Sequence, residues 1–335
     1  MSITRRQLLL ATGVGLTCSN YSLLASAWRS AQQLPYPVQE IYPALHNSMI
    51  VVAGGIYQTP AGNLGVTDSV VAYDLHRKTW SNLPKLPEPR HHPMLCSVAG
   101  VLYSFSGFTV SATGIWVASK DVLRLDEDKG QWLKLSEAEM PFPMCETVSM
   151  VRGSKVHLAT GRRPSADGNT QWRDHSDINH HLIFDTQKLT WQEGPAAPSA
   201  RNSAAAAVID GLWYIVGGRT VAEGNKAVTE VFNPETNRWS TRRDMPQAQG
   251  GLAAAAVNNK LYVFGGEFFQ DGGGVYSEVW EYLPSRDYWR QVSFMPIPRH
   301  GLGAIAVDKD IYVVAGAAKV GGRDTTNVMS IYSPK

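Results

Sequence analysis

Six tryptophans recur along the chain, and each is followed at a nearly constant distance by a glycine that ends an apolar run. The distance is 27 residues in five cases and 29 in the sixth, where two residues are inserted. A fixed period of this size is the signature of a repeat architecture built from one supersecondary unit. The pairs are Trp28 and Gly55, Trp80 and Gly107, Trp132 and Gly161, Trp191 and Gly218, Trp239 and Gly266, and Trp289 and Gly316.

Each repeat has the pattern of several short strands separated by turns. In one repeat we expect strands at Leu252–Val257, Leu261–Phe264, Glu278–Tyr282 and Tyr288–Val292. The chain has 30 glycines and 19 prolines, which agrees with a protein rich in turns. One such sheet cannot bury both of its faces alone, so the repeats must stack against one another.

The tryptophans and the strands that end in two glycines, such as Tyr214–Gly218 and Tyr262–Gly266, resemble those of the kelch family. The resemblance covers residues 28–335. It implies an all-β fold, a six-bladed kelch β-propeller with one four-stranded antiparallel blade per repeat. We expect the tryptophans to pack between blades.

The ends of the chain predict how the ring closes. After Gly316 only 19 residues remain, which supply one more strand at Val328–Tyr332 but no tryptophan strand. Trp28, at the other end, supplies the missing strand. We therefore predict a propeller closed by its N-terminal strand.

The first residues have the features of an export signal. Arg5 and Arg6 precede a moderately apolar run from Leu8 to Leu24, and Ala25-Ser26-Ala27 is a small-x-small cleavage site. This predicts a twin-arginine signal peptide at residues 1–27 and an exported propeller at 28–335, located in the periplasm or elsewhere outside the cytoplasm. An ordinary secretory signal or an uncleaved anchor is the alternative.

Charge and hydropathy exclude two classes of partner. The formal net charge of +2 gives no reason to expect nucleic acid, and no long apolar run predicts membrane contact after signal cleavage.

The register of the repeats bears on two of the cysteines. Cys96 and Cys145 lie at different registers of successive inner strands, so we expect both thiols to be free.

A candidate site lies where the innermost strands begin, about ten to twelve residues after each tryptophan. Resemblance to kelch proteins implies a pocket at that face, shared with the loops after the double glycines. We predict that Arg90, His91, Glu146, Arg201 and Arg299 contact a small polar ligand; the alternative is that the arginines brace the blades. The polar side chains pooled there are Glu40, Arg90, His91, His92, Glu146, Arg201, Asn202, Gln249, Arg299 and His300.

The chain also resembles the periplasmic sialic acid mutarotases, which are six-bladed kelch propellers. That resemblance implies a proton-transferring glutamate after the glycine that ends a second strand, and Glu267 matches it. The family's arginine would fall six residues later, at Gly273, where this chain differs. Arg219, directly after Gly218, is a substitute from a neighbouring blade.

No metal and no cofactor are expected. The copper radical oxidases related to galactose oxidase have seven blades, and Tyr42 is the one tyrosine at a matching position of the inner strands. In the segment from Asp174 to His181, the adjacent His180 and His181 would point to opposite faces of a strand. Neither pattern predicts a metal site.

Two functions follow from these observations. The first is an exported propeller that binds a small polar ligand, a sugar or sugar acid, at its axial pocket, with sugar mutarotase or epimerase activity. The second is a non-enzymatic protein-interaction module or an accessory subunit of an exported redox enzyme. The sequence leaves open whether the protein is an enzyme.

Overall fold

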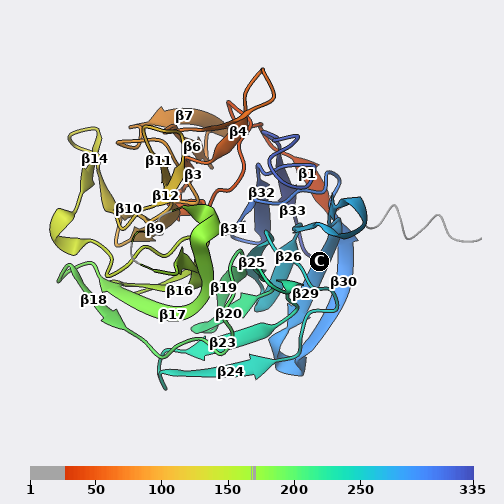
Figure 1. The fold of residues 1–335 in the computed structure, drawn as a ribbon. Coiled ribbons are helices and arrows are strands. Elements are labelled where there is room, and N and C mark those ends of the chain that lie inside the picture. The colour runs from red at the N-terminus through yellow and green to blue at the C-terminus, as the bar shows by residue number, and fades with distance from the viewer. Residues whose placement is uncertain (1–26, 167, 169–170) are drawn as a thin grey trace, which may run out of the picture.

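The computed structural model describes residues 27–166, 168 and 171–335, which form six four-stranded antiparallel sheets around a common axis (Figure 1). The predicted all-β six-bladed propeller is therefore confirmed. The signal peptide predicted at residues 1–27 lies outside the described residues except for Ala27. No helix in the described part of the chain has the length and apolar character needed to span a bilayer.

The blades follow one another in chain order, and each runs from an inner to an outer strand. Blade I has β2 (Ala44–His46), β3 (Met49–Ala53), β6 (Val70–Asp74) and β7 (Thr79–Leu83). Blade II has β9 (Met94–Val98), β10 (Val101–Phe105), β13 (Val122–Asp126) and β14 (Gln131–Lys134). Blade III has β15 (Val148–Arg152), β16 (Lys155–Pro164), β17 (His175–Asp185) and β18 (Thr190–Glu193).

The second half of the ring repeats this order. Blade IV has β19 (Ala205–Ile209), β20 (Leu212–Val216), β23 (Thr229–Asn233) and β24 (Arg238–Arg242). Blade V has β25 (Ala253–Val257), β26 (Lys260–Phe264), β29 (Glu278–Leu283) and β30 (Tyr288–Phe294). Blade VI has β31 (Gly303–Val307), β32 (Asp310–Val314), β33 (Met329–Tyr332) and, as its outer strand, β1 (Trp28–Ser30).

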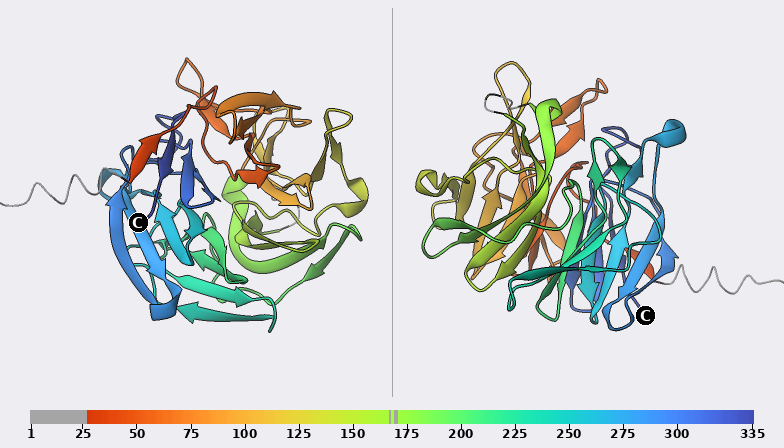
Figure 2. Two further views of the ribbon diagram at one scale, coloured as in Figure 1. Left: turned by 180° about the vertical axis from the view of Figure 1, so that it is seen from behind. Right: turned by 60° about the horizontal axis from the view of Figure 1, so that its bottom comes forward.

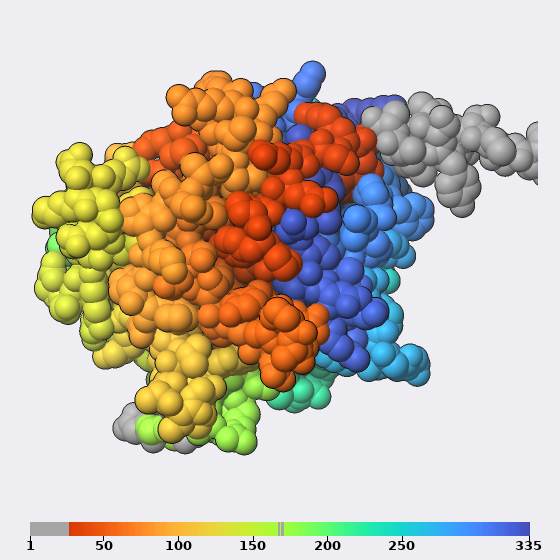
Figure 3. All heavy atoms as spheres, turned by 90° about the horizontal axis from the view of Figure 1, so that it is seen from above, coloured from red at the N-terminus to blue at the C-terminus, as the bar shows by residue number. Residues whose placement is uncertain are grey.

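Ring closure follows the prediction. β1 pairs antiparallel with β33, with Trp28 opposite Tyr332, so the first described strand completes the last blade. The indole of Trp28 lies 4.9 Å from the ring of Tyr332 and 5.9 Å from that of Phe264 in blade V. Figure 3 shows the first described residues, in red, directly against the last ones, in blue.

The tryptophans join neighbouring blades, as expected. Five of the six indole N–H groups donate to a carbonyl just beyond the tryptophan strand of the preceding blade, and Trp28 donates to a hydroxyl within that strand. Trp132 Nε1 donates to the Pro84 carbonyl at 2.9 Å, and Trp239 Nε1 donates to the Pro195 carbonyl at 2.7 Å. The corresponding bonds in the other blades are Trp80 to Gln32, Trp191 to Ala138, Trp289 to Arg243 and Trp28 to the Ser293 hydroxyl.

The double glycine allows adjacent blades to approach closely. Gly265 has a φ of +65°, and a Cβ there would lie 2.0 Å from the carbonyl oxygen of Arg299 in the next blade. Gly266 then donates its N–H to that same carbonyl at 3.0 Å. The sequence repeats glycine here because the left-handed backbone and the neighbouring main chain both exclude a side chain.

Short strands that follow the glycine at the end of each second strand, together with β8 from the opening of blade II, form what we call the crown, at one end of the axis. They are β4 (Ile56–Gln58), β5 (Leu64–Val66), β8 (Arg90–His91), β11 (Phe108–Val110), β12 (Trp116–Ala118), β21 (Arg219–Thr220), β22 (Gly224–Asn225), β27 (Glu267–Phe268) and β28 (Gly274–Val275). The 3-10 turns are η1 (Ser136–Ala138), η2 (Trp172–Asp174), η3 (Gln270–Gly272) and η4 (Pro284–Arg286).

One crown segment differs from the sequence prediction. The segment after Gly161, expected as one of the loops that follow the second strands, is largely strand, because β16 continues to Pro164 and β17 begins at His175. The two strands shift register between Ala159 and Gly161 and then form an arm that stands out from the ring (Figure 2, right).

The core lies between blades and contains Cys96 and Cys145. Phe105 of blade II packs against Phe184 and Trp191 of blade III at ring separations of 5.6 and 5.9 Å. Cys96 and Cys145 are free and buried, as expected, and burial raises the pKa of each thiol to about 12. They are therefore inert packing residues.

Candidate functional site

Three consecutive residues open each innermost strand, and each position of this opening triplet has its own structural place. The first side chain is fully buried, the second residue pairs with the crown, and the third surrounds the axis. The triplets are Val38-Gln39-Glu40, Arg90-His91-His92, Met144-Cys145-Glu146, Arg201-Asn202-Ser203, Gln249-Gly250-Gly251 and Arg299-His300-Gly301.

The third residues form a ring around the axis, in which five backbone hydrogen bonds join neighbours in succession from Glu146 round to His92. Each has a positive φ, from 48° at Ser203 to 70° at Gly251. His92 N–H donates to the Glu40 carbonyl at 3.0 Å, and Glu40 N–H donates to the Gly301 carbonyl at 2.7 Å. Similar bonds join Ser203 to Glu146, Gly251 to Ser203 and Gly301 to Gly251. This ring brings side chains from separate blades to one place, which we call the axial cluster: Glu40, His92, Glu146, Arg162, Ser203, Arg219, Glu267 and His300.

The three arginines at first positions do not reach the axial cluster. Arg90 donates to Asp121 at 2.8 Å, Arg201 to Glu230 at 2.6 Å, and Arg299 to the Ala315 carbonyl at 2.9 Å. All three side chains are fully buried, and these partners belong to the same blade as the arginine. The structure thus places the arginines as braces, which corrects their prediction as ligand contacts, because the strands of their own blades occupy the guanidinium groups.

Glu40 and His92 form the first ion pair of the axial cluster, with Glu40 Oε2 2.7 Å from His92 Nε2. Burial alone would raise the pKa of Glu40, but the charge of His92 and its hydrogen bond hold it well below the usual range. Burial lowers and Glu40 raises the pKa of His92, and the net shift is upward. This histidine is therefore the group of the pair that is poised to carry a proton.

Glu146 lies beside this pair and is almost fully buried. It accepts hydrogen bonds from the Ser203 hydroxyl at 2.7 Å and from the Trp172 indole at 3.1 Å, and Arg162 lies 3.6 Å away. Burial would raise the pKa of Glu146, but the charges of His92, Arg162 and Arg219 lower it. Glu146 is thus a carboxylate at the axis, and its contact with a ligand stays a prediction.

Glu267 starts the crown strand of blade V and reaches the cluster from outside the triplets. Its Oε1 lies 2.6 Å from Arg219 Nη1 of blade IV, and its Oε2 accepts the Gly321 N–H at 2.8 Å. Burial opposes the charge of Arg219, but Glu267 and Glu146 raise its pKa above the ordinary value. The arginine of the neighbouring blade therefore stands next to the predicted catalytic glutamate.

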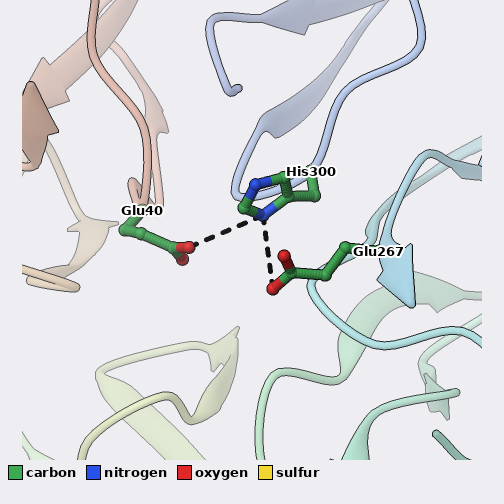
Figure 4. Close-up of side chains that lie close together, drawn as sticks. All are labelled: Glu40, Glu267 and His300. Atoms are coloured by element: carbon green, nitrogen blue, oxygen red, sulfur yellow. Dashed lines mark ion pairs between the residues drawn. The ribbon is translucent and has the colours of Figure 1, made fainter. Parts of the chain in front are cut away.

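His300 completes the cluster between two carboxylates (Figure 4). Its Nε2 lies 3.0 Å from the Lys319 carbonyl and 2.9 Å from the Gly321 carbonyl, and carbonyls only accept, so Nε2 carries a proton. Its Nδ1 faces Glu40 Oε1 at 3.7 Å and Glu267 Oε1 at 3.5 Å. Gly301 makes room for this arrangement, since a Cβ there would lie 2.9 Å from the Glu40 carboxyl.

His91 lies behind the cluster. Its Nδ1 is 2.7 Å from His92 Nδ1, and its ring packs against Phe108 and Trp116 at 4.9 and 4.3 Å. Burial and the neighbouring charge of His92 hold its pKa well below the ordinary value. His91 therefore supports His92 as a neutral partner.

Of the predicted site residues, Glu146 and Glu267 belong to the axial cluster. His91 contacts the cluster only through His92, and the three arginines lie inside the blades. Glu40, His92 and His300 are among the polar residues pooled from the sequence, but they are not among the predicted ligand contacts. The signal that could have found Glu40 and His92 is the column of third positions, which carries Glu, His, Glu and Ser in four successive repeats.

Comparison with known proteins identifies the architecture. The KLHDC2/KLHL20/DRC7 Kelch-repeats domain matches residues 40–245 and 168–335 of this chain. The chain belongs to the kelch-repeat family. Its kelch propeller is 26% identical over 337 residues to Kelch-like protein terF of Aspergillus terreus, covering 98% of this chain and 72% of that protein.

Two further relatives show how widely the kelch fold is shared. Mouse Kelch-like protein 35 is 24% identical over 254 residues, covering 75% of this chain but 38% of that protein. The solved structure of YjhT superposes with a TM-score of 0.78 at 15% identity, covering 91% of this chain and 97% of that one. At this identity the YjhT likeness shows the shared fold.

Chemically, the axial cluster of this kelch propeller combines carboxylates, imidazoles and guanidinium groups within hydrogen-bond range. Most of it is buried, with Glu40 and Arg219 the more exposed members at 16% and 20% of their side-chain surface. Just below the ring is an axial cavity lined by small and apolar side chains, among them Ala205, Ala253 and Leu302. The cavity is lined by residues that follow the triplets, and the cluster itself combines groups that can donate, accept and exchange protons.

Proposed function

We propose that this kelch propeller binds a sugar or sugar acid at the axial cluster and interconverts its anomers. The observation that carries this proposal is the convergence of Glu40, Glu146 and Glu267 with two histidines and Arg219 at the end of the axis. Hydroxyl-rich ligands suit such a site, because carboxylates accept from hydroxyl groups and arginine holds a carboxylate through forked hydrogen bonds.

Anomer interconversion needs one base and one acid. The base removes the proton of the anomeric hydroxyl, the bond from that carbon to the ring oxygen breaks, and the acid delivers a proton to the ring oxygen. Reclosure on the other face reverses these transfers. Glu267 is the proposed base, supported by its resemblance to the mutarotase glutamate, and His92, whose pKa is raised, is the proposed acid.

Gly273 stands where the mutarotase resemblance implies an arginine, and we propose that Arg219 takes the place of that arginine. Its guanidinium comes from the neighbouring blade and lies 2.6 Å from Glu267. A sugar carboxylate entering the site would compete with Glu267 for this cation. Binding of the ligand would then release the glutamate to act as the base.

The test is the rate of anomer exchange, followed by polarimetry and by proton NMR, for sialic acid and for neutral aldoses. We expect Glu267→Gln to lower the enzymatic rate by at least about 100-fold, since general base catalysis contributes about 10²–10⁴-fold. Glu193→Gln, on the exposed outer strand of blade III, is the matched control. Absence of both rate acceleration and ligand-induced thermal stabilisation would rule the proposal out.

Export is part of the same proposal and rests on the arginine pair in the sequence. Replacing Arg5 and Arg6 by lysine should leave the precursor in the cytoplasm, because paired arginines define this export route. Cell fractionation followed by immunoblotting measures the distribution. Continued export of the double-lysine form would point to the general secretory route instead.

A protein partner is the second candidate, and the rim of the crown favours it. Five large apolar side chains are exposed there, each on a different crown segment: Leu64, Val110, Trp172, Val221 and Phe269. Exposed apolar groups gathered on one face mark interaction surfaces. Cross-linking in the native host, with Val221→Ser/Phe269→Ser as the matched rim variant, tests this: a partner must be recovered with the wild type and lost with the variant.

A further inference from the structure

Three side chains of the axial cluster aim single donor atoms at one point. Glu40 opens blade I, Glu267 starts the crown strand of blade V, and His300 opens blade VI. Their nearest ligating atoms all lie within 4.8 Å of one another, with His300 Nδ1 3.5 and 3.7 Å from the two Oε1 atoms (Figure 4). The separation of these residues in sequence shows that the ring closure itself assembles the group.

The orientation of His300 indicates what belongs at this point. The proton on Nε2 is held by two backbone carbonyls, so in the neutral ring Nδ1 carries a lone pair. Nδ1 has no hydrogen-bond partner among the described residues, although the side chain is only 1% exposed. A buried lone pair that faces two carboxylate oxygens is stabilised by a positive charge placed between the three atoms.

Each of these ligating groups also has an outer partner that fixes its orientation. Glu40 Oε2 is held by His92, Glu267 Oε2 accepts the Gly321 N–H, and the Nε2 proton of His300 is held by the Lys319 and Gly321 carbonyls. Metal-binding histidines and carboxylates are held in this way by a second row of hydrogen bonds. The axial cluster thus has both the ligand atoms and their supports.

Arg219 is compatible with a cation at this point. Its guanidinium donates to Glu267 Oε1, but a carboxylate oxygen has two lone-pair directions, so one remains for a further partner. In that arrangement Arg219 is an outer partner of Glu267, as Gly321 is on the other oxygen.

We propose that Glu40, Glu267 and His300 bind one divalent cation of the zinc type. Zinc takes imidazole nitrogen and carboxylate oxygen at about 2.0–2.2 Å, which puts neighbouring ligands of a tetrahedral site roughly 3.5 Å apart. The observed separations of 3.5 and 3.7 Å from His300 Nδ1 agree with this geometry. Imidazole favours zinc over calcium or magnesium, which prefer sites made of oxygen alone.

Three protein ligands leave a fourth position for water or a ligand, which is the arrangement of catalytic rather than structural zinc sites. A sugar oxygen at that position, in the site proposed above, would be polarised by the cation, and Glu267 Oε2, on the side of Gly321, would keep a lone pair for the anomeric proton. The cation nevertheless needs no sugar for binding, and its test uses the metal alone.

The test is isothermal titration of the chelator-treated full chain with Zn²⁺, in parallel with Ca²⁺ and without sugar. We expect one zinc site, and we expect Glu40→Gln and His300→Asn each to weaken its affinity by at least about tenfold. His76→Gln, at an exposed histidine on the turn after β6, is the matched control for adventitious zinc and should leave the affinity unchanged. Circular dichroism and melting of every variant confirm that the folded fraction is compared.

Glu40 is the member of the set that is partly exposed, so Glu40→Gln keeps the test decisive if His300→Asn does not fold. Three results would overturn the zinc site: no saturable zinc binding by the wild type, equal affinity for Ca²⁺, or unchanged affinity in Glu40→Gln. Anomer exchange by metal-free protein that binds no zinc would leave the proposed function standing while the zinc site fails. Binding of one zinc ion without anomer exchange would support the zinc site while the proposed function fails.

Discussion

At the scale of single residues, the third position of each opening triplet shows how one backbone conformation serves two purposes. A left-handed backbone is costly for residues other than glycine, yet Glu40, His92 and Glu146 adopt it. The hydrogen-bonded ring holds them there and turns three titratable side chains towards the axis. In blades V and VI glycine takes this position, and the space beside it is occupied by Glu267, His300 and Glu40.

The braces are the other residue-scale feature, and Arg299 tests them. Arg299→Ala should lower the free energy of unfolding by at least about 2 kcal/mol, because the buried carbonyls of Ala315 and Val328 lose their donors. Chemical denaturation measures the loss. Arg77→Ala, on an exposed turn, should change stability by less than about 0.5 kcal/mol. A stable Arg299→Ala with impaired ligand binding would restore Arg299 to the site.

At the scale of elements, the joint between blades III and IV contains a buried histidine pair. His157 Nδ1 lies 2.9 Å from His181 Nε2, and both rings pack among Trp213 and Phe232 of blade IV. Burial, together with the charge of His181, lowers the pKa of His157 to about 3, and burial lowers that of His181 to about 4. The joint is therefore built for neutral imidazoles.

This pair predicts a loss of stability in mild acid. Both pKa values are lower in the folded chain than the unfolded value of about 6.5, so the unfolded chain takes up protons first. The free energy of unfolding is therefore highest above about pH 6.5. Between pH 6.5 and pH 5, protonation of each histidine in the unfolded chain lowers it by at most about 2 kcal/mol. Melting curves over this range measure it.

The matched variant is His157→Gln/His181→Gln, which should be less stable at pH 7.5 but should vary less with pH than the wild type. His92, with its raised pKa, acts in the opposite direction and is present in both proteins, so the difference between the two profiles isolates the pair. Parallel profiles would contradict the assignment.

At the scale of the whole molecule, closure decides both stability and site. The pairing of β1 with β33 leaves blade VI with the same four strands as the others, and Trp28 donates to Ser293 across the junction with blade V. Closure also brings Glu40, near one end of the chain, to His300, near the other. A propeller without this strand would lose an outer edge and a set of packing contacts in one step.

Deletion of residues 28–34 should therefore destabilise the whole ring, since it removes β1, Trp28 and the buried Leu34. We expect a fall in melting temperature of at least about 10 °C, because burial of each large apolar side chain contributes about 1.5–3 kcal/mol. Differential scanning calorimetry makes the measurement, with Gln33→Ala at an exposed position of the same segment as the control. An unchanged melting temperature and solubility would show that closure does not stabilise the ring.

The sequence by itself determined the number of blades, the antiparallel strands, the joining tryptophans and the closure by the first strand, because all of these follow from a repeated spacing of residues. It also selected Glu146 and Glu267, which the structure brings into the axial cluster. Only the tertiary structure decided which residue of each opening triplet faces the axis, since a left-handed kink there redirects successive side chains. It likewise decided that Arg90, Arg201 and Arg299 are braces, because their partners lie in later strands of the same blade, and that His300 meets Glu40, because the ring closes.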